Sequence, residues 1–198
     1  MNSFAIALGV LAGLVQLAGY WLYNKKLSHS EINPNVITWA IWGLGSVIAV
    51  IIYKDLANDW VKEFLPTVCA IAAFATFVHM MVRGSFQRPD RLEIELLILD
   101  VMVVVYWVVS DNPFLSNVFL IIDIQISFAP ILRSTWRFPE TEDPKPWLVW
   151  SLAYTMLTAV VIMRWEKWWD LLLPVNYLIL HLEVWWLCRK NTASAAVV

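Results

Sequence analysis

The chain has 198 residues, of which 60% are hydrophobic and only 15% are charged, and its mean hydropathy is +0.64. Soluble domains are about 25% charged, so a chain of this length cannot bury so much apolar surface in one core, and we expect it to lie in lipid. The composition excludes a cytosolic enzyme and a disordered tail, and the net charge of −2 does not suit binding to nucleic acid.

Long apolar stretches run along the whole chain. A membrane-spanning helix needs about 20 mostly apolar residues, because about 30 Å of hydrocarbon is crossed at about 1.5 Å per residue. The stretches near this length are 4–23, 36–53, 65–82, 94–109, 114–132, 147–164 and 171–188. They do not alternate with a period of two, which argues against a transmembrane barrel. The sequence therefore predicts an all-α membrane protein with seven transmembrane helices.

Basic residues set the expected orientation. Of the fourteen lysines and arginines, ten follow odd-numbered spans and four follow even-numbered spans. Because cytoplasmic loops carry an excess of basic residues, we expect the N-terminus outside and the C-terminus in the cytoplasm. This predicts a multi-pass protein of a plasma membrane or a bacterial inner membrane. Most of the thirteen tryptophans are expected to form aromatic belts at the two interfaces.

The chain contains a weak internal repeat. Residues 18–54 align without gaps on residues 129–165, at a constant offset of 111, and this places Trp39 on Trp150. Each copy holds three spans, so the fourth span is a linker helix that leaves the two triplets in parallel orientation. The predicted divisions are a first three-helix repeat at 1–83, a linker helix at 84–112, a second three-helix repeat at 113–190 and a short cytoplasmic tail at 191–198.

This layout resembles the SWEET and PQ-loop transporters. Pro130, at the end of the fifth span, is similar to the proline hinge of that family. Trp39 and Trp150, which open spans two and six, resemble its aromatic cargo contacts, and Asn176 looks like its substrate-binding asparagine. The chain departs from the family pattern in lacking a Pro-Gln pair in spans one and five. It also has Val68 where a second asparagine would stand.

The resemblance implies a facilitator or proton-linked carrier that moves a small polar solute, such as a sugar or a vitamin precursor, by alternating access. The solute would bind near the midplane between the two triplets. The implied partners are the lipid bilayer, the solute, and either further copies of the chain or another membrane protein. The missing second asparagine suits an alternative, a non-transporting membrane subunit or receptor on the same fold.

Ionisable residues inside the spans are expected to have a functional or structural role, because placing each of them at mid-bilayer costs at least about 2.5–3.5 kcal/mol. Asp123 shares a helix face with Pro130, which favours a proton-accepting or gating group beside a hinge. An interhelical hydrogen bond is the alternative for Asp123. Glu183 lies seven residues after Asn176 on one face. It is either a proton carrier or the partner of His79 or of an inner arginine.

Motifs of enzymes and metal proteins are absent from the sequence. It contains no C-x-x-C, no H-E-x-x-H and no phosphate-binding loop, so we expect no catalytic residues, no metal and no cofactor. An intramembrane enzyme that uses Asp100, Asp123 or Glu183 is a weaker hypothesis, because no two of these carboxylates share a helix. His181 is expected to be a packed, hydrogen-bonded side chain.

Overall fold

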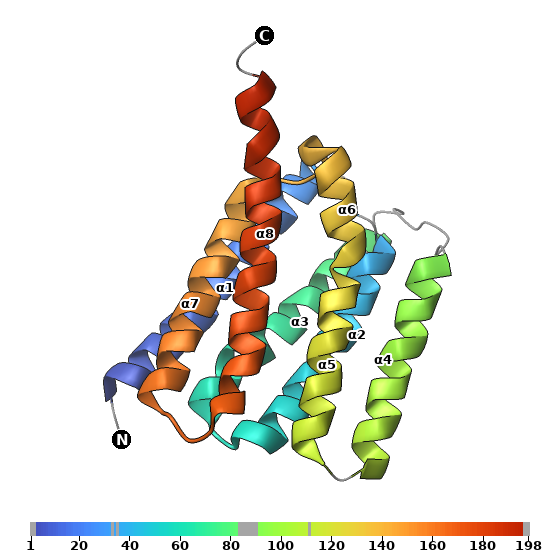
Figure 1. Ribbon diagram of the computed structural model, residues 1–198. Helices are drawn as coiled ribbons and strands as arrows, with labels where there is room; N and C mark the ends of the chain where they lie inside the picture. The colour runs from blue at the N-terminus through green and yellow to red at the C-terminus, as the bar shows by residue number, and fades with distance from the viewer. Residues whose placement is uncertain (1–2, 33, 35, 83–90, 111, 196–198) are drawn as a thin grey trace.

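A computed structural model describes residues 3–32, 34, 36–82, 91–110 and 112–195. This part of the chain is helical and contains no strand. The helices are α1 (Ser3–Ser28), α2 (Val36–Ala57), α3 (Trp60–Val82), α4 (Arg91–Ser110), α5 (Pro113–Ser127), α6 (Ala129–Arg137), α7 (Pro144–Met163) and α8 (Leu172–Ala195), with short 3₁₀ turns η1 (Pro139–Thr141) and η2 (Trp168–Leu171). Figure 1 shows the long helices running up and down the bundle in turn, with the start of α1 and the end of α8 at opposite ends.

Six segments are long and apolar enough to cross a membrane: α1, α2, α3, the combined α5–α6 at Phe114–Arg137, α7, and Trp168–Arg189. They identify an integral membrane protein and confirm six of the seven predicted spans. The seventh prediction, 94–109, corresponds to the 20-residue helix α4. That helix carries Arg91, Glu93, Glu95 and Asp100, which lower its apolar character.

Two helix boundaries differ from the expected span ends. The fifth span was predicted to end at residue 132, but α6 continues to Arg137, because its basic and polar residues extend the helix beyond the apolar segment. Similarly, α8 continues to Ala195, so residues 191–195 of the predicted tail are helical. Hydropathy marks where a helix leaves lipid, whereas backbone hydrogen bonding decides where the helix ends.

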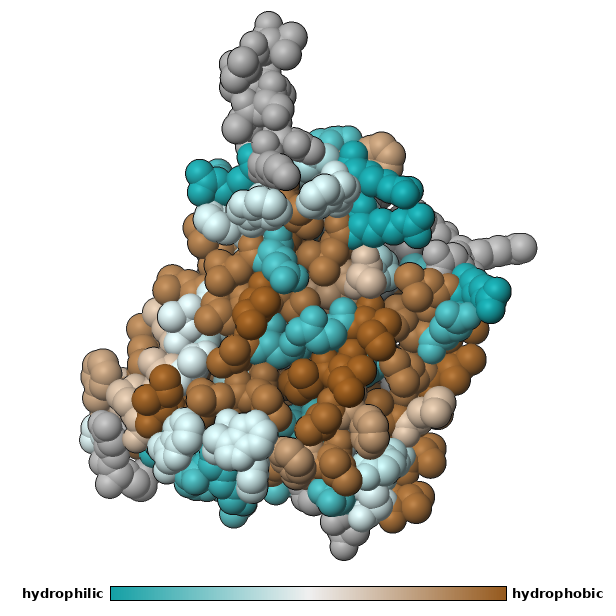
Figure 2. Space-filling model, in the orientation of Figure 1, coloured by the Kyte–Doolittle hydropathy of each residue, from teal (hydrophilic) through white to brown (hydrophobic). Residues whose placement is uncertain are grey.

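The apolar surface of the bundle fits a lipid environment. Figure 2 shows a broad hydrophobic zone around the middle of the visible face, with hydrophilic side chains at both ends and a smaller hydrophilic patch within the zone. On α4, Val101 and Val109 are among the large apolar side chains that are exposed. In water such a surface would be costly, but lipid accommodates it.

The helices that precede and follow α4 in the chain, α1–α3 and α5–α8, form two groups by sequence, and these groups meet along a central interface. In one group α3 lies against both α1 and α2, and in the other α8 lies against both α7 and α5–α6. Across the interface α1 packs against α7, and α2 packs against α5. The helix α4 packs against α5 and α2. Figure 1 shows the same arrangement, with α1 behind α7 and α2 beside α5.

The turn between α2 and α3 is built by its own polar residues. Asn58 adopts a positive φ of 43°, and its N–H donates to the carbonyl of Lys54 at 2.9 Å, which ends α2. The carboxylate of Asp59 then accepts from the N–H of Val61 at 3.0 Å, which begins α3. The N–H of Asp59 donates to Glu63 at 2.9 Å. These bonds fix the position of the first turn of α3.

Pro130 separates α5 from α6. It lies in the first turn of α6 and has no N–H to donate, so the hydrogen-bond ladder of one continuous helix is interrupted there. The intervening Phe128 keeps a right-handed helical conformation, with its N–H bonded to the carbonyl of Ile124 at 3.2 Å. The interruption places Phe128 at the centre of the bundle.

Close packing of α1 against α7 depends on Gly19. A Cβ atom at this position would lie 2.4 Å from Nε1 of Trp150, well inside van der Waals contact. The indole N–H of Trp150 donates to the backbone carbonyl of Gln16 at 3.3 Å. Because Gly19 has no side chain, the Trp150 ring packs directly against the backbone of α1, and the hydrogen bond to Gln16 fixes its position in the central interface.

Candidate functional site

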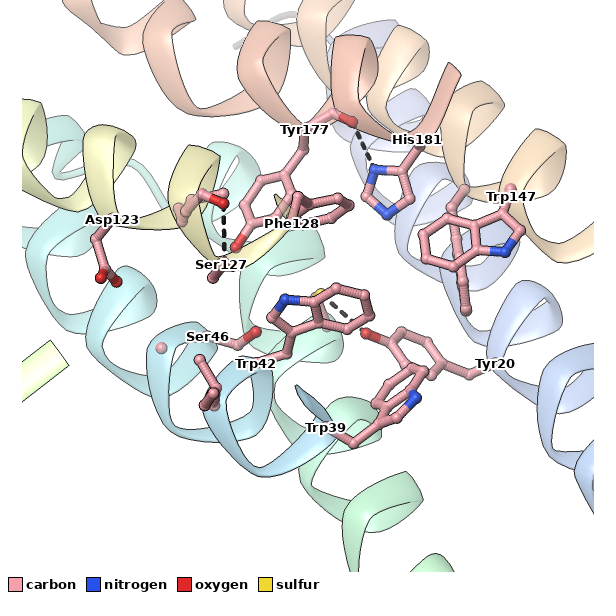
Figure 3. Close-up of a pocket in the computed structure, with 15 residues that line it drawn as sticks. Tyr20, Trp39, Trp42, Ser46, Asp123, Ser127, Phe128, Trp147, Tyr177 and His181 are labelled. Atoms are coloured by element: carbon pink, nitrogen blue, oxygen red, sulfur yellow. Dashed lines mark hydrogen bonds between the residues drawn. The ribbon is translucent and has the colours of Figure 1, made fainter. Parts of the chain in front are cut away.

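A narrow cavity lies at the centre of the interface between the two helix groups. Its volume for the centres of water molecules is about 40 Å³, enough for on the order of three waters. Residues of α1, α2 and α3 line one side, and residues of α5, α7 and α8 line the other, with Phe128 beside them (Figure 3). The aromatic lining residues are Tyr20, Trp39, Trp42, Phe128, Trp147, Trp150 and Tyr177.

These aromatic rings contact one another directly. The ring centroids of Trp39 and Trp150 are 6.4 Å apart, and those of Tyr20 and Trp150 are 4.9 Å apart. Trp42 stacks on Phe128 with 4.7 Å between centroids. All these separations fall in the range of favourable aromatic pairs, about 4.5–7 Å. The rings thus form a continuous aromatic wall in the middle of the bundle.

A small set of polar groups completes the lining. The carboxylate of Asp123, on α5, belongs to a side chain that is only 2% exposed. Ser46 and Ser127 also line the cavity, and Ser127 donates its hydroxyl proton to the carbonyl of Ile124 at 2.8 Å. Figure 3 shows Asp123 at the edge of the cavity on the side of Ser46 and Ser127.

His181 is both packed and part of the lining. Its Nδ1 donates to the carbonyl of Tyr177, so the neutral ring carries its proton on Nδ1. The ring lies among aromatic neighbours, with its centroid 5.2 Å from that of Tyr154 and 5.5 Å from that of Trp147. This agrees with the expectation of a packed, hydrogen-bonded histidine and adds that it borders the cavity.

Some predicted site residues meet at this cavity. Trp39 and Trp150 come from different helix groups, and Asp123 lies in the same lining. Pro130 instead lines a second cavity, at the end of the bundle where α2 and α4 begin. The alignment that paired Trp39 with Trp150 therefore selected two residues that face each other in space.

Two other predicted residues lie elsewhere. Asn176 is 6% exposed but is absent from the cavity lining, and its side-chain oxygen accepts from the amide of Gln125. Glu183 is exposed on α8 and lines neither cavity. A ring nitrogen of His79, one of its expected partners, lies 2.7 Å from the side-chain oxygen of Asn24. The side chain of Asp100 lies outside the described part of the chain.

The sequence analysis did not assign Trp42 and Trp147 to the site, although their spacing from Trp39 and Trp150 indicates that they line it. Trp42 follows Trp39 by three residues, and Trp147 precedes Trp150 by three. Side chains three apart share a helix face, so two tryptophan pairs on separate helices indicate an aromatic face that points inward. Belt tryptophans behave differently, since Trp60, at the start of α3, is 52% exposed.

The second cavity forms a vestibule beside the central one. Its volume, about 330 Å³ on the same measure, is much larger, and the two cavities share Trp39 and Trp42 in their walls. Arg133 and Arg137 on α6 are exposed at its rim. The vestibule lies at the end of the bundle that the basic residues predict to be cytoplasmic.

Glu142 is a buried acid in the vestibule wall. Its two carboxylate oxygens accept from the hydroxyl of Tyr23 and from the indole N–H of Trp147, each at 3.1 Å. Burial raises the pKa of the Glu142 carboxyl to about 7, because desolvation disfavours the charged form more than the two donors stabilise it. Glu142 can therefore change its charge near neutral pH.

Ion pairs join the helix groups at the opposite end of the bundle. Nζ of Lys62, in the first turn of α3, lies 2.7 Å from a carboxylate oxygen of Asp170 in η2, and both side chains are 0% exposed. Arg164, at the end of α7, donates to the two carboxylate oxygens of Asp59 at 2.6 and 3.0 Å. The hydroxyl of Tyr53 also donates to the backbone carbonyl of Asp170 at 3.0 Å. This end of the central interface is closed.

Comparison with known proteins adds no further assignment. Neither models of protein families, nor curated proteins, nor solved structures gave a match to this chain. Its function is therefore inferred from its own geometry.

Proposed function

We propose that this protein is a transporter that moves a small solute across a membrane by alternating access, as a facilitator or a proton-linked carrier. The observation that carries the proposal is the cavity at the interface between two helix groups. It adjoins a vestibule at one end and is closed by ion pairs at the other. Alternating access needs a central site with one closed and one open route.

The helix contacts support two related triplets joined by α4. In each triplet the third helix packs against the first two: α3 against α1 and α2, and α8 against α5–α6 and α7. The contacts between the triplets are related by symmetry, because in each of them the first helix of one triplet packs against the second helix of the other: α1 against α7, and α5 against α2. Lys62 and Asp170 are 108 residues apart, which is also the separation between Leu65-Pro66 in α3 and Leu173-Pro174 in α8, so the pair occupies equivalent positions of the two third helices. Rocking of one triplet against the other would separate this pair.

The interruption at Pro130 supports movement of α6 relative to α5. Pro130 lines the vestibule, so a change in the angle between α5 and α6 would alter the width of the vestibule. The missing backbone hydrogen bond lowers the cost of such bending. In this proposal the vestibule faces the cytoplasm, as the basic residues at that end predict.

Uptake into proteoliposomes tests the proposal. The purified chain is reconstituted and supplied with labelled sugars, nucleosides, vitamin precursors and organic cations, each with and without a proton gradient. We expect saturable uptake of one class of solute. The variant Trp150→Leu, which opens a gap in the cavity wall, is expected to lose at least tenfold in uptake. Trp186→Leu is the matched control, because Trp186 is exposed at the surface of α8.

The alternative function predicts a different outcome. Absence of uptake for every solute class, from protein shown to be folded and inserted, contradicts transport. A second membrane protein that then copurifies in a fixed ratio supports the alternative, a subunit or receptor.

A further inference from the structure

We propose that the vestibule binds a small organic monocarboxylate together with a proton, with Arg133 and Arg137 as the counter-ions of the carboxylate and Glu142 as the proton acceptor. This inference rests on the proposed function and names its substrate class. The central cavity has space for only a few waters, whereas the vestibule, at about 330 Å³ on the same measure, has space for on the order of twenty and accommodates a small solute.

One face of α6 brings two arginines to the vestibule. Pro130, Arg133, Ser134 and Arg137 all line it, and their spacing of three or four residues places them on the same side of the helix. Within the described part of the chain, neither arginine forms an ion pair. A guanidinium donates two parallel hydrogen bonds to a carboxylate, so the two side chains offer matched donors to such a group.

The charge of the vestibule lining depends on Glu142. Among the described lining residues, the charged side chains are Glu93, Arg133, Arg137 and Glu142. Their formal charges cancel when both glutamates are ionised and leave +1 when Glu142 is protonated. A lining with one net positive charge matches a solute with one negative charge, whereas a phosphate monoester carries about two at neutral pH. Binding of the carboxylate and binding of the proton therefore favour each other.

Glu142 has the surroundings that this role needs. It is 5% exposed in the vestibule wall, and burial places its pKa at about 7, so it takes up a proton from the vestibule water near neutral pH. The nearby Lys26 is occupied by Asp143, at 2.8 Å, and by Glu31. The titratable and charged groups around Glu142 are Tyr23 and Lys26 on α1, Glu93 on α4, Arg133 and Arg137 on α6, the adjacent Asp143, and Cys188 on α8.

The other walls of the vestibule are largely apolar. Trp39 and Trp42 separate it from the central cavity, and Leu92, Ile131 and Phe138 also line it. An apolar or aromatic body gains from burial against such side chains. A solute with one carboxylate and an apolar body would thus have a partner in the lining for each of its two parts.

Apart from the arginines, the lining offers few hydrogen-bond donors. The hydroxyl groups of Ser134 and Thr141 donate to backbone carbonyls at 3.0 and 2.7 Å. The indole N–H of Trp39 donates to the hydroxyl of Tyr23 at 3.3 Å. A sugar needs directed partners for several hydroxyl groups. The lining therefore favours a solute whose polar part is a single charged group.

Equilibrium binding to the purified full-length chain, at pH 6 and at pH 8, tests this inference apart from transport. The probe is labelled benzoate, which is ionised at both pH values. Benzamide and benzamidine, a neutral and a cationic molecule of nearly the same shape, are the competitors. We expect saturable benzoate binding that is about tenfold tighter at pH 6, because the protonated fraction of Glu142 falls about tenfold between the two pH values. Equal affinity at both pH values, or displacement by either competitor as effective as by unlabelled benzoate, would overturn the inference.

Arginine variants locate the binding site. Arg133→Gln and Arg137→Gln each remove a positive charge from an exposed position, so both chains are expected to fold. We expect benzoate affinity at pH 6 to fall at least tenfold in each. Lys145→Gln is the matched control, because Lys145 is exposed at the start of α7 and is not among the lining residues. Unchanged affinity in both arginine variants contradicts the inference.

Glu142→Gln tests the proton acceptor, because it keeps the side chain uncharged at every pH. We expect its benzoate affinity at pH 8 to rise to the value that the parent chain shows at pH 6, an effect that a merely structural role would not produce. Glu140→Gln is the control, because Glu140 is exposed, and it should keep the parent's pH dependence. Should Glu142→Gln fail to fold, calorimetry of the parent chain in two buffers of different ionisation enthalpy measures proton uptake on benzoate binding at pH 8. Absence of that uptake, or retained pH dependence in Glu142→Gln, overturns the role of Glu142.

Benzoate, added to the solutes of the uptake experiment, separates the two proposals. Benzoate binding of the expected kind without uptake of any solute supports the site and contradicts transport. Uptake of another class of solute without benzoate binding supports transport and overturns the carboxylate site. Binding of phosphatidylglycerol that depends on the two arginines, without benzoate binding, assigns them to a lipid headgroup and also overturns the site. Neither binding nor uptake by folded protein contradicts both.

Discussion

The buried pair of Lys62 and Asp170 gives a quantitative prediction about the closed end of the bundle. Both side chains are 0% exposed, and their charged atoms are 2.7 Å apart. Removing one partner breaks a buried pair, which typically costs about 3–5 kcal/mol. In Asp170→Asn the remaining carboxylate near Nζ of Lys62 is that of Glu166, which is 3.9 Å away and 54% exposed, so it compensates the buried charge only weakly. We therefore expect Lys62→Met and Asp170→Asn each to lower the free energy of unfolding by about this amount.

The double variant Lys62→Met/Asp170→Leu is expected to behave differently. It removes both charges and replaces them with apolar groups of similar size, so the desolvation cost disappears together with the attraction. Such replacements are often neutral or stabilising. We expect the double variant to unfold within about 1 kcal/mol of the parent chain, which is a strongly non-additive result.

Reversible unfolding in detergent micelles, followed by tryptophan fluorescence, measures this cycle. Asp55→Asn is the control for loss of an exposed carboxylate, and its effect is expected to stay within about 0.5 kcal/mol. The reasoning is refuted if each single variant costs less than about 1 kcal/mol, or if the cost of the double variant equals the sum of the two single costs.

Two further predictions concern other contacts of the central interface. The raised pKa of Glu142 means that the folded chain keeps a proton that the unfolded chain releases between pH 4.5 and about 7, so the free energy of unfolding falls by about 3 kcal/mol as pH rises through that window. Glu142→Gln should flatten this dependence, and an unchanged slope in unfolding measured against pH would assign it to another group. Gly19→Ala forces Trp150 to move and is expected to cost about 1–3 kcal/mol. Gly43→Ala, whose Cβ would lie 3.5 Å from its nearest neighbour, should be neutral or stabilising by up to about 1 kcal/mol, and equal thermal shifts for the two variants would contradict the close approach at Gly19.

The composition and the apolar segments determined the class of this protein. Segments of about 20 apolar residues must form helices in lipid, where every backbone polar group needs an internal partner. The six membrane-spanning segments followed directly from this requirement. The seventh, α4, was harder to judge because charged residues such as Glu93 and Glu95 dilute its apolar character.

The sequence determined part of the candidate site. The alignment of Trp39 with Trp150 and the placement of Asp123 within an apolar helix depended only on residue order, and all three residues line the cavity. Helical spacing also grouped Trp42 with Trp39, a local relation that needs no tertiary information.

Only the tertiary structure decided which helix faces meet. The rotation of α8 about its axis turns Tyr177 and His181 toward the cavity and directs the neighbouring Asn176 to Gln125 on α5. Likewise, Lys62 and Asp170 are 108 residues apart, and nothing local brings them together. An apolar segment specifies a helix in lipid but not its rotation, because lipid solvates all apolar faces alike and packing against neighbouring helices sets the angle.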